Sequence, residues 1–249
     1  MPPHPFEDLA MKPILVLQHL SSDGPAYLAT WLQRHELSFE VRNTEVGEAC
    51  PEHMDAYSAL AILGGEMSAN DPLPSLRRAE LLILDAMARG RPVIGHCLGG
   101  QLMARALDAR VGPSPAPEVG WHRMSLHDHP CARDWFGEGD IGPVFQWHEE
   151  AFELPPGATP LAGSDACTHQ AFAIGPHLAL QFHVEVDEEK LRRWSMLDSA
   201  AYRSLQQRHA TVHSGAAMRE AMALHLLVQQ ALADRIYARW LDGVISRAG

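Results

Sequence analysis

The sequence has few basic residues for its acidic content. It contains 20 Lys and Arg against 31 Asp and Glu, for a formal net charge of −11 over 249 residues. A surface that binds nucleic acid needs clustered Lys and Arg, and here these residues are dispersed along the chain. We therefore expect no nucleic-acid partner, and a small-molecule substrate or a protein partner instead.

Cysteine is also scarce, with four residues at positions 50, 97, 131 and 167 and no Cys-x-x-Cys pair. The chain is far longer than a typical disulfide-stapled domain, which favours a reducing, cytoplasmic location. Residues 1–11 lack the basic and apolar regions of an export signal and are expected to form a loose tail. No apolar run approaches the ~20 residues of a membrane-spanning helix, so we expect a soluble protein without membrane contact.

No Gly/Ser linker, charge block, internal repeat or low-complexity run divides the chain. We expect a main domain over residues 1–187 and a helical extension over residues 188–249 that packs on the same domain. The apolar positions of this extension recur about every four residues, which favours packing on its own core over a contact between subunits of a homo-oligomer.

The first half of the chain alternates short apolar strands with helices. Strands are expected at 14–17, 39–42, 59–63 and 92–95, and helices at 27–35, 76–90 and 98–107, with Ser21, Ser22 or Asp23 capping the first helix. This alternation predicts an α/β fold with a mostly parallel open sheet and helices on both faces.

The second half departs from this alternation. Short strands near 119–126 and 144–147 are expected as antiparallel additions within a segment rich in Pro and Gly. Residues 178–183 alternate in polarity and predict a strand that carries His183 to its C-terminal end. From Glu188 onward the pattern is helical to the end.

The segment Gly95-His96-Cys97-Leu98-Gly99-Gly100-Gln101 places a cysteine between a predicted strand and a predicted helix. Glycines there permit a tight turn that exposes the sulfur. The helix N-terminus favours the thiolate and offers free N–H groups for an oxyanion. Cys97 is therefore a candidate nucleophile, although a buried structural cysteine is the alternative interpretation.

A thiol nucleophile needs a base, and the base needs an acceptor that orients it. His183 and Glu185 lie two residues apart and share one face of the predicted strand. Alone they are typical of a surface pair, but their strand ends at the same sheet edge as the Cys97 turn, where ligands of such sheets usually bind. Gly64-Gly65 ends another strand at this edge and can bring a backbone N–H to an oxyanion beside that of Leu98.

Five segments in order resemble the class I glutamine amidotransferase family, especially its stand-alone GMP-synthase-like members. These are Gly64-Gly65-Glu66-Met67-Ser68, the segment 95–101, Glu118-Val119-Gly120-Trp121, Gln146-Trp147-His148, and Gln181-Phe182-His183-Val184-Glu185. The resemblance implies a flavodoxin-like catalytic domain in which Cys97 attacks the side-chain amide of glutamine. It further implies His183 as acid/base, Glu185 as its partner, and Gly65 and Leu98 as the oxyanion hole.

The resemblance also implies that Gln101 helps to bind glutamine, and it places Trp147, His148 and Gln170 near the substrate. The cysteine takes the amide carbon, ammonia leaves, and water hydrolyses the γ-glutamyl thioester, with no metal or organic cofactor. Ammonia then serves an unidentified acceptor, for example in a separate synthetase subunit, because no Walker-type phosphate loop is found in the chain. His96 replaces the usual aliphatic residue before the nucleophile, and Glu149-Glu150 replaces a common Gly-Asp.

Three other interpretations remain open. A hydrolase of γ-glutamyl peptides or amides would use the same three residues. A non-catalytic binding or regulatory protein would retain the fold without turnover, and a redox sensor would need a second cysteine near Cys97. The segment His127-Asp128-His129-Pro130-Cys131 carries metal-ligand residue types, but its spacing matches no closed site, so no metal is expected.

Overall fold

A computed structural model describes residues 12–245, and the expected loose tail at 1–11 lies outside this range. An eight-stranded sheet forms the centre of the molecule, with strand order β2-β1-β3-β4-β10-β9-β8-β6. The strands from β2 to β10 in this order are parallel, and β9, β8 and β6 are antiparallel additions. The predicted α/β fold with a mostly parallel sheet is therefore confirmed.

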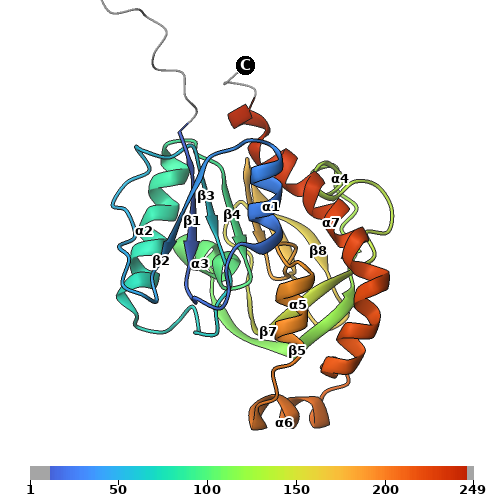
Figure 1. Ribbon diagram of the computed structural model, residues 1–249. Helices are drawn as coiled ribbons and strands as arrows, with labels where there is room; N and C mark the ends of the chain where they lie inside the picture. The colour runs from blue at the N-terminus through green and yellow to red at the C-terminus, as the bar shows by residue number, and fades with distance from the viewer. Residues whose placement is uncertain (1–11, 246–249) are drawn as a thin grey trace, which may run out of the picture.

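The first half follows the predicted order closely. Its elements are β1 (Ile14–Gln18), α1 (Ala26–Arg34), β2 (Phe39–Asn43), β3 (Ala59–Ile62), α2 (Pro74–Ala88), β4 (Val93–His96) and α3 (Leu98–Ala106). Alternate residues of β1 point to opposite faces of the sheet, and each face is covered by helices. Ile14 and Val16 join the core beneath α1 and α7, whereas Leu15 and Leu17 join the core beneath α2 and α3. The helices cover both faces of the sheet, as Figure 1 shows.

The middle of the chain holds more regular structure than its Pro and Gly content predicts. Its elements are β5 (Val111–Arg123), β6 (Ser125–Leu126), α4 (Pro130–Phe136), β7 (Pro143–Phe152), β8 (Thr159–Gly163), β9 (Ala171–Ile174) and β10 (His177–Leu180). Strands β5 and β7 are longer than expected and form a separate antiparallel sheet rather than joining the large one. This two-stranded sheet crosses below the strand ends in Figure 1.

The predicted strand over 178–183 is wrong in its second half. Strand β10 ends at Leu180, and residues 181–186 form a loop that contains bends. The amide of His183 donates to the carbonyl of Phe145 on β7 at 2.9 Å, so the chain leaves the large sheet to reach the two-stranded one. His183 and Glu185 are thus placed by a loop between two sheets.

The C-terminal region contains three helices in place of one continuous helical run. These are α5 (Glu188–Trp194), α6 (Ala200–Arg208) and α7 (Gly215–Ile245). Helix α7 packs against α1, α4, α5 and the two-stranded sheet, and buries Ile236, Tyr237 and Trp240. Helix α6 has no buried residue and projects at the bottom of the view in Figure 1. The division at residue 187 stays a prediction.

Within residues 12–245, no helix has the length and apolar content required to cross a membrane.

Candidate active site

Cys97 occupies the sharp turn between β4 and α3. Its backbone has φ 49° and ψ −109°, a conformation that costs free energy for a residue with a side chain and is typical of functional turns. The turn is held by the Cys97 amide, which donates to the carbonyl of Leu180 at 2.8 Å. The sulfur thus stands at the N-terminus of α3, where the partial positive charge of the helix favours an anion.

Glycines allow α3 to lie directly on the sheet. A Cβ at Gly100 would meet the carbonyl oxygen of Leu180 at 2.5 Å, and Cβ atoms at Gly95 and Gly99 would collide with backbone atoms of Gly99 and Ile62. No side chain fits at these three positions without a shift of the backbone. The glycines of the 95–101 segment therefore bring the start of α3 to the strand ends.

The side chains of Cys97 and His183 line one cavity of about 770 Å³. Nδ1 of His183 lies 2.7 Å from Oε1 of Glu185, and both side chains are buried. Around Cys97, Nε2 of Gln181 and the carbonyl oxygen of Trp147 each lie 3.7 Å from the sulfur. The three residues predicted from the sequence are brought together.

Electrostatics keep His183 in its charged form. Burial opposes its protonation, but the charges of Glu185 and Cys97, with the hydrogen bond to Glu185, raise the pKa of His183 to about 10. For Glu185, burial acts in the opposite direction and favours the neutral acid. The charges of His183 and Lys190, with the hydrogen bond from the His183 ring, outweigh this and lower the pKa of Glu185 below its usual range. The pair is therefore an imidazolium and a carboxylate at neutral pH.

Of the two expected oxyanion donors, Gly65 lies at the cavity and Leu98 lies next to Gly65. A Cβ at Gly65 would meet Cδ2 of Leu98 at 2.8 Å, so the two residues are neighbours. Within residues 12–245, neither the amide of Gly65 nor that of Leu98 donates a hydrogen bond to a protein atom. Both N–H groups thus remain available to a ligand.

Three of the four residues expected to contact substrate line the cavity. Gln101 is nearly buried, and its Nε2 donates to the carbonyl oxygen of Glu150 at 3.1 Å. Trp147 is half-buried and stacks on Tyr202 of α6 at 5.7 Å between ring centroids. His148 lines the cavity, but both of its ring nitrogens already have protein partners.

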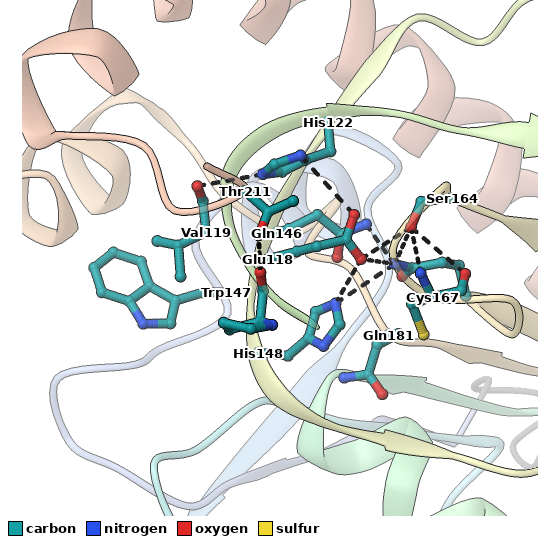
Figure 2. Close-up of polar contacts among 12 residues, drawn as sticks. Glu118, Val119, His122, Gln146, Trp147, His148, Ser164, Cys167, Gln181 and Thr211 are labelled. Atoms are coloured by element: carbon teal, nitrogen blue, oxygen red, sulfur yellow. Dashed lines mark hydrogen bonds and ion pairs between the residues drawn. The ribbon is translucent and has the colours of Figure 1, made fainter. Parts of the chain in front are cut away.

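Gln170 does not lie at the cavity. It is fully buried and belongs to a polar cluster around the Glu118 carboxylate. Figure 2 shows this carboxylate with Ser164 and His148 beside it. Oε2 of Glu118 accepts from Oγ of Ser164 at 2.9 Å and from Nε2 of Gln170 at 2.5 Å, and it lies 3.3 Å from Nε2 of His148. The cluster ties β7, which carries Trp147 and His148, to β5 and to the loop after β8.

Sequence reasoning missed the roles of Asp23 and Lys190. Asp23 was expected as a candidate cap for α1, but the cap position is Pro25 and no side chain caps this helix. Asp23 instead forms a buried ion pair with Lys190, which lies in the C-terminal region. Two residues so far apart along the chain give no local signal.

His96 is fully buried, with Nε2 3.4 Å from the hydroxyl of Tyr237. Burial, the largest influence, lowers the pKa of His96, so its ring is neutral.

All four cysteines are free thiols. Within residues 12–245, no group of three or more His, Cys, Asp or Glu side chains is placed to hold a metal ion.

Comparisons with known proteins agree with this architecture. The family model described as Glutamine amidotransferase class-I matches residues 30–195. A solved glutamine amidotransferase from Methylobacillus flagellatus is 32% identical with a TM-score of 0.86, covering 94% of this chain and 96% of that one. The chain belongs to the class I glutamine amidotransferase family.

Two curated relatives indicate the range of this similarity. The glutamine amidotransferase-like protein YfeJ of Salmonella typhimurium is 30% identical over 181 residues, which cover 69% of this chain and 74% of the relative. Gamma-glutamyl peptidase 3 of Arabidopsis thaliana is 30% identical over 108 residues, which cover 41% of this chain and 43% of the relative.

Proposed function

We propose that the chain hydrolyses the side-chain amide of glutamine through a γ-glutamyl thioester on Cys97, releasing ammonia for an acceptor. The observation that supports this proposal is that Cys97 and His183 line one cavity, with Glu185 paired to the His183 ring. Membership of the class I glutamine amidotransferase family supports it independently.

In the proposed reaction, the Cys97 thiolate attacks the amide carbon while the oxygen is held by the amides of Gly65 and Leu98. The His183 imidazolium gives its proton to the nitrogen, and ammonia leaves. The neutral imidazole then takes a proton from water, which attacks the thioester and releases glutamate. Glu185 keeps the ring oriented and balances its charge through both steps.

The test is ammonia release from glutamine by wild type and by Cys97→Ala, with Cys131→Ala as the control. Cys131 lies in α4, away from the cavity, and burial, the largest influence, raises the pKa of its thiol. We expect loss of turnover in Cys97→Ala alone, and labelling of Cys97 by a glutamine-analogue affinity reagent. Unchanged turnover in Cys97→Ala would exclude this mechanism, and absence of labelling would favour a binding or regulatory protein.

A second candidate is a hydrolase of γ-glutamyl peptides or amides with the same residues. The size of the cavity favours it, because about 770 Å³ lies within the range that holds ligands larger than a single amino acid. Helix α6 and the loop before it add Leu197, Tyr202 and Leu205 to the lining of the cavity. These three residues are called the outer wall below. The relative named gamma-glutamyl peptidase 3 supports this candidate as well.

A substrate panel separates the two candidates. Glutamate release from γ-glutamyl dipeptides is compared with ammonia release from glutamine, in wild type and in Tyr202→Ala. If the outer wall binds a peptide, Tyr202→Ala should raise KM for the dipeptide several-fold and leave KM for glutamine nearly unchanged. A peptidase is excluded if the dipeptides are not cleaved at all.

A further inference from the structure

The Asp23 carboxylate faces the cavity that contains Cys97 and His183. Asp23 lies in the loop between β1 and α1, and its side chain is nine-tenths buried. Its Oδ1 pairs with the ammonium group of Lys190. Lys190 does not pair with Oδ2, and within residues 12–245 no hydrogen bond to Oδ2 is formed, so this oxygen can accept a bond from a ligand in the cavity.

Gly64 lies between Asp23 and the catalytic groups, and its lack of a side chain lets them approach one another. A Cβ at Gly64 would lie 3.0 Å from Cε1 of His183, 3.1 Å from Oδ2 of Asp23 and 3.7 Å from Cβ of Cys97. The three side chains, which come from different elements, therefore lie close together around Gly64. All three also line the cavity, so a substrate bound there can contact the general acid and the Asp23 carboxylate.

Lys190 holds this carboxylate in place. Its ammonium group is buried, donates to the carbonyl of Gly24 at 2.9 Å, and lies 3.6 Å from Oε1 of Glu185. It also lies 5.0 Å from the ring centroid of Trp194, whose indole packs edge-on against His183. Because buried lysines are rare unless paired, Lys190 links Asp23 to the His183–Glu185 pair as a fixed charge arrangement.

We propose that Asp23 is a further catalytic residue that holds the N–H of the departing nitrogen, a role that rests on the proposed function. When the tetrahedral intermediate breaks down, the His183 proton passes to the nitrogen. The C–N bond breaks with its electron pair going to nitrogen, and the carbonyl re-forms as the thioester. Oδ2 of Asp23 accepts a hydrogen bond from the nitrogen, which becomes stronger as that nitrogen gains positive charge.

The test compares two substrates of the same shape, the γ-methylamide and the γ-methyl ester of glutamate. The amide presents an N–H to Asp23 during departure, and the ester presents none. In Asp23→Asn we expect kcat/KM for the methylamide to fall about 10- to 100-fold, as for loss of a charge-assisted hydrogen bond, and kcat/KM for the ester to fall by less than about 3-fold. Asp242→Asn, an exposed aspartate of α7, is the matched control with no expected change in either substrate.

Asp23→Asn leaves the buried Lys190 ammonium without its paired carboxylate and could therefore destabilise the fold. A second variant separates such a folding defect from a loss of catalysis. Asp23→Asn combined with Lys190→Met removes both charges, so neither member of the ion pair is left as a buried charge without its partner. Its cooperative unfolding is measured, and the same selective loss on the methylamide is expected.

Equal losses on amide and ester in both variants, or no loss on either substrate, would overturn the role of Asp23 while leaving Cys97 as nucleophile. A wild-type protein that cleaves neither compound, or a Cys97→Ala variant that cleaves both, would overturn the proposed function as well.

Discussion

His183 and Glu185 form a buried pair in which the carboxylate lies 2.7 Å from Nδ1 of the ring. The bond fixes the ring so that its other nitrogen is directed toward the cavity. It exists although the two residues lie in a loop rather than in a strand. The His183 amide donates to Phe145 on β7, the Glu185 carbonyl accepts from the Tyr27 amide of α1, and Lys190 lies 3.6 Å from the Glu185 carboxylate.

Replacement of Glu185 by Gln should therefore impair catalysis more than folding. The amide cannot stabilise the imidazolium, and it leaves the ring free to take the wrong tautomer. We expect kcat/KM to fall about 100- to 10,000-fold, as when the carboxylate of a comparable triad is replaced by its amide. Ammonia release is the measurement, and Glu188→Gln, an exposed position in the first turn of α5, is the control. Activity close to wild type in Glu185→Gln would contradict the role of Glu185.

The same pair predicts how stability depends on pH. Glu185 has a lowered pKa in the folded state, so its contribution is present above the ordinary value of 4.5 and is lost as the pH falls below it. His183 has a raised pKa, so its contribution is complete below 6.5 and is lost as the pH rises toward about 10. The pair therefore stabilises the fold most between these two ordinary values.

Chemical denaturation of wild type and Glu185→Gln across this range is the measurement. The difference in unfolding free energy should be largest between pH 4.5 and 6.5 and should shrink on both sides. A difference that stays constant with pH would show that the pair does not carry these charges.

The glycine contacts of α3 predict an asymmetry between two Gly→Ala substitutions. At Gly100 the new Cβ would meet the carbonyl oxygen of Leu180 at 2.5 Å, so the helix must move away from β10. We expect a loss of about 1–3 kcal/mol in unfolding free energy, together with reduced turnover, because Cys97 begins the same helix. At Gly243, in α7, a Cβ meets nothing within 4 Å, and we expect a gain of about 0.5–1 kcal/mol. Equal effects at both positions would contradict the packing argument.

The polar cluster around Glu118 is expected to stabilise the fold by holding β7 in place. Glu118→Gln replaces one acceptor oxygen by an N–H donor that faces the hydrogens of Gln170, so we expect a loss of about 1–3 kcal/mol. Glu153→Gln, just after β7, removes only an exposed ion pair with Arg110, and a loss below about 1 kcal/mol is expected. Thermal unfolding of both variants is the measurement, and comparable losses would show that the cluster is not important for stability.

The sequence by itself indicated the strand and helix order of the first half and the meeting of Cys97, His183 and Glu185, the three proposed catalytic residues. It did so because these features depend on local patterns. A buried parallel strand is apolar throughout, as at residues 14–17, and the nucleophile turn needs glycines at fixed positions around Cys97. The ends of parallel strands meet at one edge, so the site followed from the order of the strands.

Only the tertiary structure decided how the remaining parts assemble around that edge. The chain bends away after Leu180 because the His183 amide finds its acceptor on Phe145, in a different sheet. The Glu118 cluster withdraws Gln170 from the cavity, and Lys190 reaches back to Asp23 across most of the sequence. Such pairings are set by burial, because a charge or amide removed from water must find a partner, and that partner can come from any part of the chain.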